Sequence, residues 1–176
     1  MENNRSLLGT VGAIWGLTGV HLLLISATFR LWPKAVDAFS HHFAWYHWVM
    51  LIIIVLGMAY MEGYKGFQQA FSPRTAARAR YLRNNPRIGH VALAPFFCMG
   101  YFYATKRRKI TSISLTLGII MLIILVSSLS QPWRGIIDAG VVVGLVWGIV
   151  SLLIFSIRAL SSDYYRYSPD VPEEGV

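Results

Sequence analysis

The chain has little charge and few acidic residues. Of its 176 residues only 14% are charged, and 16 Lys and Arg outnumber 8 Asp and Glu, which gives a net charge of +8. Soluble globular domains carry about 25% charged residues. The shortage of charge therefore excludes an ordinary soluble domain. An apolar content of 55% and a mean hydropathy of +0.51 indicate an integral membrane protein.

Cysteine and catalytic motifs are also scarce. Cys98 is the single cysteine, which excludes an internal disulfide and a Cys-based zinc site. The sequence has no Gly-x-Ser-x-Gly motif and no phosphate-binding loop, so it favours a non-enzymatic function. Most of the positive charge lies beside apolar segments, where it would meet anionic lipid headgroups. We therefore expect membrane lipids as partners, and no nucleic acid.

Four apolar runs have the roughly 20 residues that a membrane-spanning helix needs. They lack the polar-apolar alternation of barrel strands. The sequence therefore predicts one all-α integral membrane domain over residues 1–160, followed by a polar, flexible C-terminal tail at 161–176. The predicted spans are residues 7–29, 44–64, 110–129 and 136–157.

A fifth apolar stretch, residues 88–105, contains Pro95 and would reach only about 27 Å as a straight helix. The basic residues indicate whether it crosses the membrane. If it does, eight lie on each side, which contradicts the positive-inside bias. If it enters and leaves on one side, thirteen lie in the cytoplasm. The three left outside are Arg30, Lys34 and Arg134.

We therefore predict four transmembrane helices and a Pro-broken interfacial or re-entrant helix at 88–105. A basic amphipathic helix is predicted at 73–83, because Ser72-Pro73 favours a helix start and Asn84-Asn85-Pro86 a helix end. The expected location is a bacterial inner membrane, with both termini in the cytoplasm. The residues expected to bind lipid headgroups are Arg74, Arg78, Arg80 and Arg107.

Glycines line one face of the first predicted span and one face of the last. Small residues at such spacing let helix backbones approach closely. The two faces could pack inside one chain, or they could form the interface of a homo-oligomer or of a complex with another membrane protein. The glycines expected to pack are Gly12, Gly16, Gly140, Gly144 and Gly148.

Histidines are the candidate cofactor ligands. His21 lies in the first predicted span and His47 near the start of the second, and two facing histidines can hold haem b. His41, His42 and His47 could bind a transition metal. The sequence has no Glu-x-x-His motif of a di-iron protein. The alternative is that these histidines are neutral, hydrogen-bonded or interfacial.

Glu62 lies near the inner end of the second predicted span, where an ionisable group is costly. One interpretation is a local salt bridge with Lys65 or with an arginine of the basic helix. The other is a proton or cation site, gated by residues 88–105, in an inner vestibule that Ser112 and Thr116 would also line.

Three functions follow from these patterns. The leading hypothesis is a small inner-membrane protein that acts through helix packing, as a homo-oligomer or as an accessory subunit of a membrane complex. The first alternative is a transporter or channel component with a re-entrant segment. The second is a haem- or metal-binding redox protein that uses His21 and His47.

Overall fold

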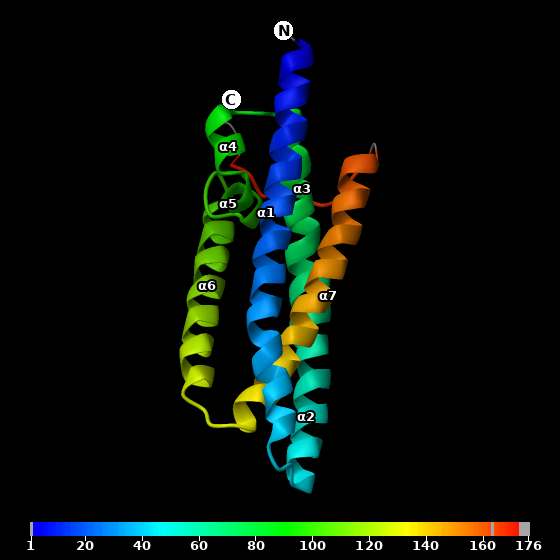
Figure 1. Ribbon diagram of the computed structural model, residues 1–176. Coiled ribbons are helices and arrows are strands. Elements are labelled where there is room, and N and C mark those ends of the chain that lie inside the picture. The colour runs from blue at the N-terminus through cyan, green and yellow to red at the C-terminus, as the bar shows by residue number, and fades with distance from the viewer. Residues whose placement is uncertain (1, 163, 173–176) are drawn as a thin grey trace.

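The computed structural model describes residues 2–162 and 164–172, and their side chains from residue 7 on. Four long helical stretches lie side by side and alternate in direction (Figure 1). α1 (Glu2–Asp37) descends in this view, and α2 (Trp45–Met58) rises. The remaining long helices are α6 (Lys106–Ser127), which descends, and α7 (Trp133–Ser161), which rises.

The second stretch is longer than the sequence predicts. α2 continues without a break into the π-helical η2 (Ala59–Phe71) and then into α3 (Ser72–Asn84). The predicted basic helix at 73–83 therefore exists, but as the extension of a helix that is long and apolar enough to cross a membrane. The four stretches long and apolar enough to cross a membrane are Leu7–Ser40, Trp45–Asn84, Lys106–Ser127 and Trp133–Ser161, which confirms the number of predicted spans.

Residues 88–105 form two short helices and a turn, α4 (Ile88–Ala92) and α5 (Ala94–Met99). The helix breaks at Leu93, so Pro95 lies in the first turn of α5, where proline is tolerated. α5 ends at Gly100, whose φ of 87° favours glycine. Residues 88–105 begin and end in the same half of the bundle (Figure 1). We call residues 88–105 the cap.

The glycines of α1 pack on the cap and on α3. A Cβ added at Gly16 would lie 2.7 Å from Cys98 Sγ and 3.2 Å from Ala94 Cβ. Gly12 faces Val91 in the same way. The main apolar core forms where these helices meet α7. It contains Ala13, Leu17, Val20, Ala79, Leu82, Ala94, Phe97, Cys98 and Leu152.

The glycines of α7 pack on α2 and η2. A Cβ at Gly140 would lie 2.7 Å from Ile54, and one at Gly148 would lie 2.6 Å from the Phe67 ring. Conversely, the Trp147 ring of α7 packs against Gly63 of η2. Both glycine faces are therefore used inside the chain, and each has a different partner.

The C-terminal segment 164–172, which belongs to the tail predicted at 161–176, packs against the upper half of the bundle. The Tyr165 hydroxyl donates a hydrogen bond to Pro73 O at 3.0 Å, and the backbone N–H of Thr105 donates to Asp170 O at 2.9 Å. Both hydrogen bonds have a backbone carbonyl as acceptor. Every residue carries such a carbonyl, so the sequence does not indicate these contacts. Residues 173–176 lie outside the described residues.

At the opposite end, η1 (Ala38–Ser40) and a short connection join α1 to α2. Gln131 links α1 to the start of α7. Its side-chain amide donates to Lys34 O at 3.2 Å and to Asp37 Oδ2 at 3.0 Å, and its Oε1 accepts from the Gly135 N–H at 3.1 Å. The ends of α1 and α7 are thereby held together.

Candidate functional site

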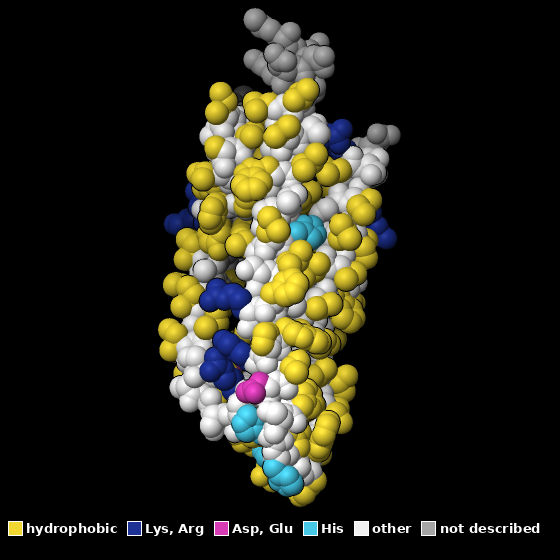
Figure 2. Space-filling model, viewed as in Figure 1, with side chains coloured by type: hydrophobic (Ala, Val, Ile, Leu, Met, Phe, Trp, Pro, Cys, Tyr) yellow, Lys and Arg dark blue, Asp and Glu magenta, His cyan; other side chains and the backbone are white. Residues whose placement is uncertain are grey.

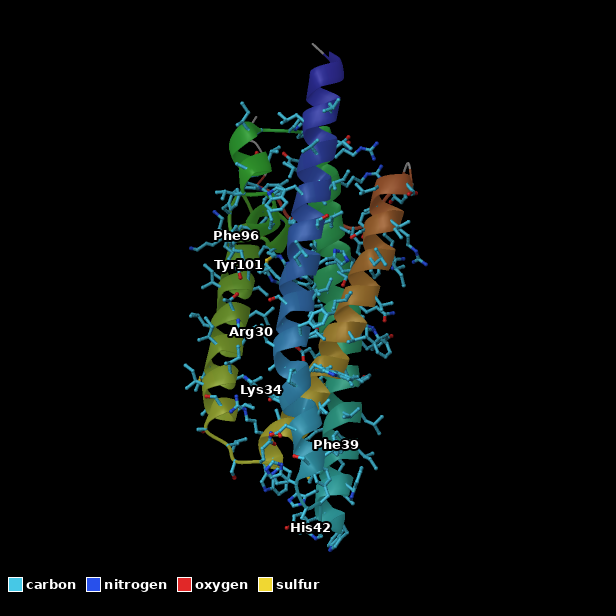
Figure 3. The ribbon with its side chains drawn as sticks, viewed as in Figure 1. Arg30, Lys34, Phe39, His42, Phe96 and Tyr101 are labelled. Carbon is cyan, nitrogen blue, oxygen red and sulfur yellow. The ribbon has the colours of Figure 1, made fainter. Side chains whose placement is uncertain are left out.

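The lower half of the α1 face that carries the glycines is not covered. At about 100° per residue, Leu23, Arg30 and Lys34 fall within about 40° of Gly16. The upper half of this face meets the cap, but Leu23 is 50% exposed. Figure 3 places Arg30 and Lys34 in the space between α1 and α6.

The facing side of α6 is equally open. Its upper end is fixed to the cap, where Ser112 Oγ donates to Met99 O at 2.8 Å, and its lower end buries Val126. Ile119 and Ile123 lie within about 40° of Ser112 on the helix, so they point the same way. They are nevertheless 47% and 58% exposed. α6 therefore stands away from α1 between its two ends.

We call this space the α1–α6 slit, with Leu23, Arg30 and Lys34 on one wall and Ile119 and Ile123 on the other. Figure 2 shows Lys and Arg side chains gathered along the line between α1 and α6. Phe96 and Tyr101 lie at the upper end of the slit in Figure 3. The Tyr101 hydroxyl lies 2.5 Å from Thr116 Oγ1.

The two cations of the slit have no carboxylate at ion-pair distance among the described residues. Lys34 acts electrostatically on Asp138, but Asp138 pairs with Arg134 at 3.8 Å. Two cations below an apolar wall can attract the anionic headgroup of an amphiphile.

The sequence predicts that Arg78 binds lipid headgroups, but the structure places its side chain completely buried inside the bundle. Nε donates to Phe97 O at 2.6 Å, and Nη1 donates to Pro169 O at 2.8 Å. Nη2 donates to Phe102 O at 2.9 Å and to Tyr103 O at 3.0 Å. One guanidinium thus joins α3, the cap and the C-terminal segment. We call this group the Arg78 clamp.

The other predicted headgroup ligands differ in their surroundings. Arg80 donates to the carbonyls of Ala159 and Ser162, at the C-terminal end of α7, where helix carbonyls lack partners within the helix. Arg74 is partly exposed and lies 3.8 Å from Asp170. Arg107 is exposed and stays a candidate headgroup ligand.

His21 and His47 do not face each other. The His47 ring lies 4.9 Å from the Trp133 ring, beside the end of α1, and its Nδ1 accepts from the Ala44 N–H at 3.1 Å. Lys34 lies in the last turn of α1, and His21 is 13 residues before it, or about 20 Å away along the helix. Its Nδ1 donates to Leu17 O at 2.8 Å. This separation is too large for a shared haem iron.

The proposed metal ligands are also dispersed. His41 and His42 are exposed, and Figure 3 shows His42 at the lower tip of the molecule. His47 is buried among aromatic rings. Across the described residues, no three His, Cys, Asp or Glu side chains lie close enough together to hold a metal ion.

The predicted inner vestibule is divided between two places. Ser112 and Thr116 bond to the cap, whereas the Glu62 carboxyl lies against Gly144 of α7. Lys65 does not pair with Glu62, because its Nζ lies over the Tyr60 ring, 4.8 Å from the centroid. The carboxyl therefore lacks the salt bridge that the sequence offers.

Sequence reasoning missed the slit and the clamp. Arg30 and Lys34 entered only as charges in a topology count, although their spacing of four residues places them on one helix face. Arg78 resembles its neighbouring arginines in sequence. A weak signal distinguishes it, since its neighbours on α3 include three alanines, Ala76, Ala77 and Ala79.

Comparisons of the chain with protein-family models, with curated proteins and with solved structures give no match.

Proposed function

We propose that this chain is a non-enzymatic inner-membrane protein that binds an anionic amphiphile in the α1–α6 slit. The observation that carries the proposal is the pair Arg30 and Lys34, which lie on one helix face, form no ion pair with a carboxylate among the described residues, and oppose an apolar wall. A phosphate or carboxylate headgroup would meet the two cations, and its hydrocarbon chain would lie along Leu23, Ile119 and Ile123.

The membrane position fits this arrangement. Trp45 and Trp133 mark the lower boundary, since tryptophan prefers the interface. A hydrocarbon core of about 30 Å takes about 20 residues of helix, so measured from Ala38 it ends near Gly19, where Pro95 packs. The cap would then lie at the inner interface, and Arg30 and Lys34 would lie in the outer leaflet.

The glycine faces favour ligand binding over assembly as the main function. Gly12 and Gly16 are covered by the cap, and Gly140, Gly144 and Gly148 are covered by α2 and η2. These small-residue surfaces are therefore not free to receive a helix of a second copy or of another membrane protein.

Cysteine labelling tests the topology. In a Cys98→Ser background, Asn84→Cys and Arg107→Cys are expected to react with a membrane-impermeant maleimide from the cytoplasmic side, and His42→Cys from the opposite side. The reason is that α3 ends at Asn84 and α6 begins at Lys106 in the upper half of the bundle, whereas His42 lies at the lower tip (Figures 1 and 3). Labelling of positions 84 and 107 from opposite sides would make the four-span arrangement wrong.

Lipid retention tests the slit. The double variant Arg30→Ala/Lys34→Ala is expected to weaken binding of phosphatidylglycerol by about 2 kcal/mol, or roughly thirtyfold, because each cation contributes about 1 kcal/mol. Native mass spectrometry of protein from nanodiscs measures the bound lipid, with nanodiscs of phosphatidylcholine and of added fatty acid as separate arms.

The matched control is Lys106→Ala/Lys109→Ala, which removes two exposed cations from the other end of α6. It is expected to retain the slit lipid. Equal losses in the two double variants would show a general surface attraction and would contradict the slit as the binding site.

A further inference from the structure

The Glu62 carboxyl occupies a space that exists because residue 144 is glycine. A Cβ added at Gly144 would lie 2.9 Å from Glu62 Oε2 and 3.2 Å from Glu62 Cδ. Oε2 is buried and has no hydrogen-bond partner in the part of the chain that the structure describes. The carboxyl therefore lies flat against the α7 backbone at the interface between η2 and α7.

Large side chains cover this contact toward the inner side. The Trp147 ring packs on Gly63, and its Nε1–H donates to Gln68 Oε1 at 2.8 Å. One turn further, Phe67 packs on Gly148. Oε2 is therefore enclosed between η2 and α7, whereas the Glu62 side chain as a whole is partly exposed.

Few charged groups face Glu62 from the elements around it. On its own element, Lys65 lies over Tyr60, and Tyr64 stacks with Tyr60 at 6.0 Å between ring centroids. A carboxylate without a cationic partner is costly inside a membrane protein.

The described ionisable groups of α7, the helix packed on Glu62, are Arg134, Asp138 and Arg158. Arg134 and Asp138 pair with each other at 3.8 Å, and Asp138 is six residues, or about 9 Å, before Gly144. Arg158 is fourteen residues beyond Gly144, or about 21 Å. None of them supplies the missing cation.

We propose that Glu62 is a proton-binding site: its carboxyl group is protonated while Oε2 lies buried against Gly144, between η2 and α7. Proton release creates a carboxylate that must be hydrated, so it favours separation of η2 from α7. Proton binding and the packing of η2 on α7 are therefore linked.

Carbodiimide labelling tests the site. Dicyclohexylcarbodiimide is apolar and adds to a protonated carboxyl group. The carboxyl oxygen bonds to the carbodiimide carbon, the proton moves to a nitrogen, and the whole reagent is retained after acyl transfer. We expect an adduct on Glu62 at neutral pH by peptide mass spectrometry, none in Glu62→Gln, and at least tenfold less labelling by a water-soluble carbodiimide.

Gly144→Ala tests whether the packing of the Glu62 carboxyl on α7 matters for labelling. Gly118→Ala is its control, because a Cβ at Gly118 meets nothing within 4 Å. Gly144→Ala is expected to displace the carboxyl into a hydrated position, so that the apolar reagent labels it less and the water-soluble reagent more. Gly118→Ala is expected to label as the wild type does.

Infrared spectroscopy of the wild-type protein in lipid gives a readout that needs no reagent and no folded glycine variant. We expect a protonated carboxylic acid band at neutral pH that is absent in Glu62→Gln. A spectrum without that band, or equal labelling of Glu62 by both carbodiimides, would overturn the proposal.

Discussion

Arg78→Met is expected to destabilise the protein by about 4 kcal/mol, because it leaves buried carbonyls without donors. The wild-type guanidinium donates to four carbonyls and lies over the Phe97 ring, 4.3 Å from the centroid. Methionine fills most of the volume and donates nothing. The cap and the C-terminal segment would therefore lose their common attachment to α3.

Arg78→Lys keeps the positive charge but removes the planar guanidinium group, so it tests which of the two stabilises the clamp. The four carbonyls are reached from three different nitrogen atoms of one planar group, and an ammonium has its donors at a single point. We expect Arg78→Lys to restore less than half of the lost stability.

Chemical denaturation in detergent, followed by circular dichroism, measures both variants. Arg107→Met is the control, since Arg107 is exposed and its replacement is expected to change stability by less than about 0.5 kcal/mol. If Arg78→Met unfolded at the same denaturant concentration as the control, the clamp would not hold the cap.

The four long apolar helices could be predicted from the sequence because they depend on a local property. A run such as 136–157 is long and apolar wherever it packs, and α7 contains it with a few residues added at each end. The same local reasoning found the break near Asn84 and the basic helix before it, since proline and asparagine act on their own neighbours.

The contacts of individual side chains could not be predicted, because they depend on distant segments. Arg78 and Arg80 have similar sequence surroundings, yet Arg78 reaches Pro169 O, 91 residues away, and Arg80 reaches the end of α7. A basic residue beside a membrane span meets either lipid or a backbone carbonyl. For Arg78 the C-terminal segment supplies one of the carbonyls, and the sequence does not indicate that this segment folds back onto α3.

For the candidate sites, too, the sequence indicates the residues within each helix but not their contacts with distant segments. The sequence places His21 and His47 in neighbouring spans, but their depths differ because α1 and α2 run antiparallel from the connection at 38–44. The sequence identified Glu62 as an acid near the inner end of a predicted span, whereas its contact with Gly144 required the register of η2 against α7.

Gly16→Leu is expected to displace the cap and to make Cys98 reactive. In the wild type, Cys98 is completely buried, and burial raises the pKa of its thiol to about 12. The thiolate that attacks maleimide is then roughly one part in 10⁵ at pH 7. A Cβ at Gly16 already lies 2.7 Å from Cys98 Sγ, so a leucine cannot fit unless α5 moves.

Overpacking of this kind costs about 3 kcal/mol. Maleimide labelling of the folded protein in lipid, followed by mass spectrometry, is expected to rise at least tenfold over the wild type. Gly118→Leu is the matched control, because the space around Gly118 is open. An unlabelled Cys98 in folded Gly16→Leu would contradict the close packing of α1 on the cap.

The same variant connects the cap to the slit. The face of α1 that holds the cap through Gly16 continues downward as Leu23, Arg30 and Lys34, and Ser112 ties the upper end of α6 to the cap. Displacement of α5 therefore changes the spacing between α1 and α6. We expect Gly16→Leu to lose slit lipid although both cations remain. Retention of the lipid with a reactive Cys98 would show that the cations hold it without the cap.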